Sequence, residues 1–107
     1  MTEPPFVQRR FELDGGELIV RFFTPSKAPG GEFQCHYVIG WPERDVRGYA
    51  CGEDGLQALM LALRRVHFDL IKSGAYKAGR LTWCDQADLD LPSTWGAGPL
   101  YDPPPQP

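Results

Sequence analysis

Three cysteines and two histidines are the residues of this chain with the widest chemical repertoire. Cys35, Cys51 and Cys84 lie far apart in the sequence, without the paired C-x-x-C spacing that is typical of zinc sites. Cys35 and His36 are adjacent, so in a strand their side chains point to opposite faces and cannot pair as thiolate and base. We therefore expect buried structural thiols. We expect no catalytic residue, no metal ligand and no cofactor.

A second group of polar residues, Asp85, Asp88 and Asp90, follows the last apolar segment. Calcium loops need ligands at fixed offsets and a glycine at the turn, and this segment lacks that pattern. The glycines of the chain match no phosphate-binding motif either. The sequence thus favours a solvated acidic face and a protein that is not an enzyme. A cysteine- or metal-dependent enzyme is the third hypothesis.

Alternation of apolar and polar residues predicts an antiparallel β-meander in the first half of the chain. Turns rich in Gly, Pro and Asp separate its segments, and a short last strand is expected further on. The expected strands are residues 6–13, 17–23, 32–41, 46–52 and 80–84. One face of such a sheet is apolar, so a second layer must cover it.

The segment 54–74 predicts a long α-helix. Asp54 suits the N-cap with Gln57 completing a capping box, and Gly74 suits the left-handed C′ position. A broad apolar stripe should pack on the sheet, formed by Leu56, Leu59, Met60, Leu63, Val66, His67 and Leu70. The expected fold is a two-layer α+β domain, with a meander of four to five strands packed against one long helix.

The opposite side of this helix is the predicted partner-binding surface. Leu61 and Phe68 are seven residues apart, so they stand on one line, beside Arg65 and Lys72. An apolar pair with a cationic rim suits a partner protein or a second copy of the chain. The solvated sheet face is the alternative surface, with Arg10, Arg21 and Arg47 as candidates.

The chain is expected to form a single domain over residues 1–84, followed by a Pro-rich C-terminal tail over residues 85–107. Trp95, Leu100 and Tyr101 are candidate anchors in that tail. A net charge of −3 with scattered Lys and Arg argues against nucleic acid as a partner, and no apolar run approaches a membrane span. An odd number of cysteines favours reduced thiols in a cytoplasm.

Two segments, "YACGEDGLQALMLALRRV" and "YKAGRLTW", resemble an uncharacterised family of small bacterial α+β proteins, a domain of unknown function. The resemblance covers about residues 32–84 and consists of Gly-x-Asp, a Gln-Ala-Leu helix and Tyr-x-x-Gly-x-Leu-x-Trp. The matching residues are Tyr49, Gly52, Asp54, Gln57, Ala58, Leu59, Tyr76, Gly79, Leu81 and Trp83. It implies a bacterial cytoplasmic protein and carries no catalytic residues.

Taken together, these observations favour an acidic, non-enzymatic protein-binding module, such as an immunity- or inhibitor-type protein. The second hypothesis is a homo-oligomeric structural or regulatory protein that pairs through the outer helix face or an edge strand. In either case the expected partner is another protein or a second copy.

Overall fold

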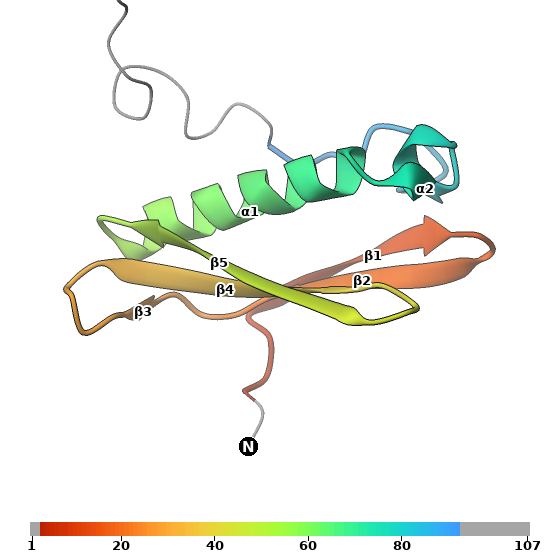
Figure 1. The fold of residues 1–107 in the computed structure, drawn as a ribbon. Coiled ribbons are helices and arrows are strands. Elements are labelled where there is room, and N and C mark those ends of the chain that lie inside the picture. The colour runs from red at the N-terminus through yellow and green to blue at the C-terminus, as the bar shows by residue number, and fades with distance from the viewer. Residues whose placement is uncertain (1–2, 93–107) are drawn as a thin grey trace, which may run out of the picture.

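The computed structural model describes residues 3–92. Within them an antiparallel sheet of six strands packs against a long helix and a short one (Figure 1). The strands are β1 (Val7–Leu13), β2 (Gly16–Phe22), β3 (Ser26–Lys27), β4 (Phe33–Gly40), β5 (Asp45–Gly52) and β6 (Leu81–Thr82). The helices are α1 (Gly55–Ile71) and α2 (Gly74–Lys77). The α+β fold predicted from the sequence is confirmed.

The four long strands form the predicted meander, in the order β1-β2-β4-β5. The two-residue strand β6 pairs with β1 at one edge of the sheet, and β5 forms the other edge. The extra strand β3 pairs with the first residues of β4, beyond the end of β2. The turn from β1 to β2 passes through Asp14 and Gly15, both with positive φ (51° and 79°), as expected for a tight hairpin.

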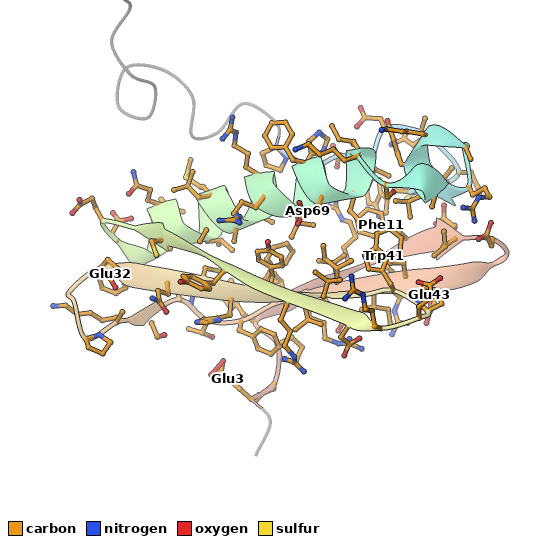
Figure 2. All side chains as sticks on the ribbon, viewed as in Figure 1. Glu3, Phe11, Glu32, Trp41, Glu43 and Asp69 are labelled. Carbon is orange, nitrogen blue, oxygen red and sulfur yellow. The ribbon has the colours of Figure 1, made fainter. Side chains whose placement is uncertain are left out.

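Both helices lie over the same face of the sheet, and the N-terminal segment lies on the other side of the sheet (Figure 1). Figure 2 shows Phe11 and Trp41 between the layers and Glu3 on the opposite side of the sheet. Alternate strand residues fill the core: Phe11, Leu18, Val20 and Ile39 are at most 1% exposed. We call the uncovered side the open face. No helix among the described residues is long and apolar enough to cross a membrane.

Helix α1 begins as predicted but ends differently. The Asp54 carboxylate accepts a hydrogen bond from the Gln57 backbone N–H (2.8 Å), and Gln57 Oε1 accepts one from the Glu53 N–H (2.6 Å). The C-cap is Lys72 in a right-handed conformation. Gly74 is not a left-handed cap, because the hydroxyl of Ser73 caps a new helix, α2, whose first residue is Gly74.

The buried stripe of α1 differs from the predicted one. Its fully buried residues are Ala58, Ala62, Val66 and Leu70, spaced by four. At 3.6 residues per turn this stripe is rotated by about 80° from the predicted one. The prediction was therefore right for Val66 and Leu70 and wrong for Leu56, which is 66% exposed. Small side chains at Ala58 and Ala62 let the helix lie close to β4 and β5, with the larger leucines on the flanks.

The segment after β6 packs onto the domain. Leu89 is 1% exposed and belongs to the core, although it lies beyond the boundary expected after residue 84. Arg9 Nη1 donates hydrogen bonds to the carbonyls of Leu89 (3.0 Å) and Asp90 (2.7 Å). The predicted tail anchors Trp95, Leu100 and Tyr101 lie outside the described residues.

Candidate binding surface on the open sheet face

Two neighbouring rows of side chains cross the open face. The first row runs from Arg21 on β2 over Val38 on β4 to Arg47 on β5, because each pair is opposite in register. Val38 is only 5% exposed although it faces away from the helices. Arg21 and Arg47 thus lie on either side of the buried apolar side chain of Val38. Their Cα atoms are roughly 9.5 Å apart, from two inter-strand spacings.

The second row consists of three rings. Phe23 N donates to the carbonyl of His36 (2.9 Å), and His36 is opposite Tyr49. The His36 and Tyr49 rings lie 5.2 Å apart, and Tyr49 is 48% exposed. The rows are two residues apart along each strand, which separates them by roughly 6.6–6.8 Å.

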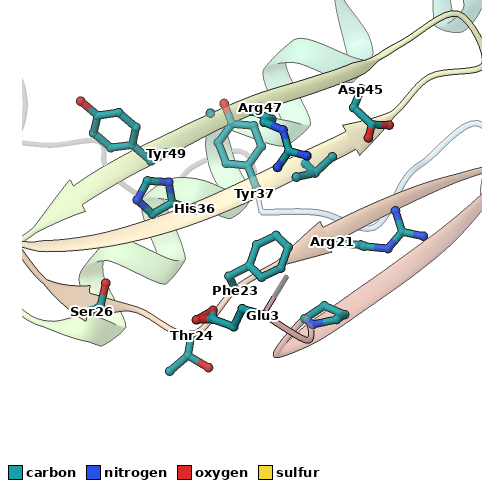
Figure 3. Close-up of a pocket in the computed structure, with 13 residues that line it drawn as sticks. Glu3, Arg21, Phe23, Thr24, Ser26, His36, Tyr37, Asp45, Arg47 and Tyr49 are labelled. Carbon is teal, nitrogen blue, oxygen red and sulfur yellow. The ribbon is translucent and has the colours of Figure 1, made fainter. Parts of the chain in front are cut away.

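The two rows line a hollow of about 670 Å³, bounded on one side by Glu3 and Pro5 of the N-terminal segment. Figure 3 shows Arg21 and Arg47 on different strands and the three rings beside them. The remaining lining residues are Thr24, Ser26, Tyr37, Asp45 and Gly48. The volume is in the range of small-molecule pockets.

The arginines of this hollow differ in their pairing from other arginines on the surface. Arg10 forms an ion pair with Glu17 (2.8 Å), and Arg80 forms one with Asp14. Neither Arg21 nor Arg47 forms an ion pair with any residue between 3 and 92. Their charges are therefore open to an incoming anion.

Two carboxylates also border the hollow and restrict where an anion can sit. Asp45 Oδ1 and Arg21 Nη1 both come within 4 Å of the position that a Cβ on Gly40 would take (3.8 and 3.9 Å). Glu3 lies beside Thr24 and Phe23 (Figure 3). Asp45 therefore competes with an incoming anion near Gly40, whereas Val38, two residues away on β4, lies between Arg21 and Arg47 in register.

The helix surface predicted from the sequence is less open than expected. Arg64 lies over one side of the Phe68 ring (4.8 Å from guanidinium carbon to centroid), and Lys72 lies 5.9 Å from the centroid. Leu61 is partly buried and packs against the core. Arg65 instead reaches the hydroxyl of Tyr37. Partner binding through these residues stays a prediction.

Tyr37 connects the sheet to the helix near β5. Its ring extends across Gly48, where an added Cβ would lie 2.5 Å from both Cζ and Oη. Burial raises the pKa of the Tyr37 hydroxyl and the Asp69 carboxylate raises it further, while Arg65 lowers it. The hydroxyl is hydrogen-bonded to Arg65 and Asp69, so this contact fixes one face of α1 above the middle of β5.

The cysteines divide into two kinds. Cys35 is buried and its thiol lies 3.5 Å from the carbonyl oxygen of Phe23, and burial raises its pKa to about 11. Cys51 and Cys84 are exposed, so the prediction of buried thiols was wrong for both. Cys51 faces outward on the edge strand, and Cys84 lies in a turn with positive φ (50°). Within the part of the chain that the structure describes, no three His, Cys, Asp or Glu side chains gather into a metal-binding group.

Sequence reasoning had named Arg21 and Arg47 as alternatives, together with Arg10, which is paired and lies outside the hollow. It missed Phe23, His36, Val38 and Tyr49. The signal for these residues was the register, because the pairing of β2 with β4 and of β4 with β5 fixes which residues stand side by side on the open face.

A family model described as "Domain of unknown function (DUF6968)" matches residues 7–93. The chain therefore belongs to this family, and the match includes β1 to β6 and the segment that contains Leu89. No curated protein and no solved structure shows significant similarity to the chain.

Proposed function

We propose that this protein is a non-enzymatic binding module that holds an acidic segment of another protein on the open face of its sheet. One observation carries the proposal: Arg21 and Arg47 lack ion-pair partners among the described residues and lie in a row beside a second row of three rings. Arginine and tyrosine are enriched where protein partners bind, both in composition and among the residues that dominate affinity. Solvated sheet faces are normally polar, so this row of rings is unusual.

The geometry defines the segment that would fit. A carboxylate over Val38 can accept hydrogen bonds from both guanidinium groups, each contributing about 1.5–3 kcal/mol when charged. A ring or apolar side chain would then stack on Tyr49 and His36. The row separation of roughly 6.6–6.8 Å equals the distance between residues i and i+2 of an extended peptide. The motif that fits is thus an acidic residue followed two positions later by an aromatic one.

This proposal includes the cellular setting expected from the sequence. A bacterial cytoplasm keeps thiols reduced, which suits two exposed free cysteines. A small domain that covers an acidic patch of another protein can act as an immunity- or inhibitor-type protein. In that role its partner would present the acidic segment at a functional surface.

A titration followed by two-dimensional ¹H–¹⁵N NMR tests the proposal with a defined probe. The probe is the blocked peptide acetyl-Glu-Ala-Phe-amide, and its control is the same peptide with Gln in place of Glu. We expect shifts at residues of both rows that saturate with the acidic peptide and are much weaker with the control. The Arg21→Gln/Arg47→Gln variant should lose them, whereas Arg10→Gln should keep them. Equal shifts with both peptides, or none in the two rows, would refute this site.

A further inference from the structure

The two edges of the sheet are treated very differently by the rest of the chain. At the β1 edge, β6 pairs with Glu12 and Leu13. Further along, Arg9 of β1 holds the carbonyls of Leu89 and Asp90. At the other edge, β5 pairs with β4 over all of its eight residues, and no described strand pairs with its outer side. Figure 1 shows this outer side of β5 in front of the sheet, with no helix across it.

The β5 strand also lacks the features that usually protect an edge. It contains no proline and no lysine, and its register with β4 is continuous, without a bulge. Its two charged residues, Asp45 and Arg47, are on the open face with Tyr49 and Cys51. An exposed edge of this length is a template for pairing with another strand.

We propose that β5 pairs antiparallel with β5 of a second copy of this chain, about a two-fold axis at Gly48. This inference does not depend on the proposed function. With this centre seven of the eight residues of β5, Asp45 to Cys51, are paired, and each faces the partner residue whose number sums with its own to 96. At the axis the two glycines meet without side chains.

The side chains of the open face are complementary in this register. Arg47 faces the partner's Tyr49, and Tyr49 faces the partner's Arg47, so two cation–aromatic pairs flank the axis. Asp45 faces the partner's Cys51, which avoids a like-charge contact between directly opposite residues. The second copy thus contributes a ring beside Arg47, and both hollows lie on one continuous face.

The helix side of the same edge is complementary as well. Arg65 and Asp69 are exposed, and both reach the Tyr37 hydroxyl, whose ring crosses Gly48. They therefore lie close to the proposed axis. A two-fold rotation brings Arg65 of one copy toward the partner's Asp69, and the reverse, so opposite charges meet twice. Charge complementarity on both faces favours a second copy over an unrelated strand.

A register-specific cross-link tests the pairing. In a Cys84→Ser background, Asp45→Cys places a thiol opposite the partner's Cys51. Within one chain these positions are six residues apart in a strand, which is too far for a disulfide. We expect mild oxidation to give a disulfide-linked dimer, and we expect Asp45→Cys/Cys51→Ser/Cys84→Ser and Cys84→Ser alone to give none.

Sedimentation of the unmodified chain supplies the second readout. The expected mass is twice 12.0 kDa. Tyr49→Lys, which sets a lysine against the partner's Arg47, should restore a monomer with an unchanged circular dichroism spectrum. A monomeric unmodified chain would overturn the proposal. So would a dimer that the Asp45→Cys thiol fails to cross-link, because that dimer must use another surface or register.

Discussion

The close approach of Tyr37 to Gly48 gives a quantitative prediction for the substitution Gly48→Ala. Glycine in a strand that does not need positive φ usually tolerates alanine, which stabilises by about 0.4–1 kcal/mol through the unfolded chain. Gly48 has no positive φ, so backbone conformation alone predicts a gain. The added Cβ, however, would lie 2.5 Å from Cζ and Oη of Tyr37.

The ring has little freedom to move aside, because Tyr37 is 3% exposed and its hydroxyl is held by Arg65 and Asp69. Overpacking of this kind costs about 1–3 kcal/mol. Displacing the hydroxyl from charged partners costs about 1.5–3 kcal/mol more. After subtracting the gain in the unfolded chain, we expect Gly48→Ala to lower the free energy of unfolding by about 1.5–5.5 kcal/mol.

Tyr37→Leu provides the matched background, because it removes the atoms that the new Cβ would meet. Gly48→Ala added to Tyr37→Leu should be neutral or stabilising, so the sign of the effect reverses. Urea unfolding of the four proteins, followed by circular dichroism, measures this coupling. If Gly48→Ala cost the same in both backgrounds, the contact with Tyr37 would not be the reason for glycine here.

Three further predictions concern the segment after β6, the thiols and the helix surface. Leu89→Ala should lower the free energy of unfolding by about 2–5 kcal/mol, as for other buried leucines, whereas Leu56→Ala should stay within about 0.5 kcal/mol; equal effects in urea unfolding would contradict the packing of Leu89. Alkylation at pH 8 should modify Cys51 and Cys84 quickly and Cys35 only on unfolding, as read by mass spectrometry. Because the pKa of Cys35 rises from 9.0 to about 11 on folding, the thiol ionises first in the unfolded chain. The contribution of the neutral Cys35 thiol to stability should therefore be lost as pH rises through that interval. A Cys35→Ala variant should lack this part of the pH dependence, and a profile identical to that of the unmodified chain would contradict the prediction. Leu61→Asp/Phe68→Asp should retain partner binding if the open face is the site, and selective loss in a folded variant would return the site to the helix.

Much of the fold follows from the sequence because its signals are local. The alternation in β1, β2, β4 and β5 and the cap at Asp54 depend on neighbours a few residues away. The buried face of α1 was harder to predict, because the helical periodicity of the large apolar residues favoured a face that includes Leu56. The face of α1 that packs on the sheet instead carries small side chains, Ala58 and Ala62. Which face this is depends on the packing distance between helix and sheet, and the sequence pattern does not show that distance.

The candidate site was predicted only in part for a related reason. Arg21 and Arg47 are visible as outward-facing charges, but their alignment across Val38 depends on the register of β4 with both β2 and β5. Alternation cannot show that Arg10 pairs with Glu17 while Arg21 has no ion-pair partner among residues 3–92, because both arginines are outward-facing strand residues. Leu89 lies after the last strand, where no periodic pattern predicts burial. It is buried because it packs against the part of the core beside β1.

The most direct test of the central claim, that the open face binds an acidic segment of a partner protein, is a quantitative pull-down from bacterial lysate with four folded proteins. These are the unmodified chain, Arg21→Gln/Arg47→Gln, Arg10→Gln and Leu61→Asp/Phe68→Asp. Arginines that dominate an interface contribute at least about 2 kcal/mol each, which is roughly thirtyfold in affinity. We predict one stoichiometric partner that is retained by the unmodified chain, by Arg10→Gln and by the helix variant, and is lost from Arg21→Gln/Arg47→Gln. Retention of that partner by Arg21→Gln/Arg47→Gln would contradict the claim.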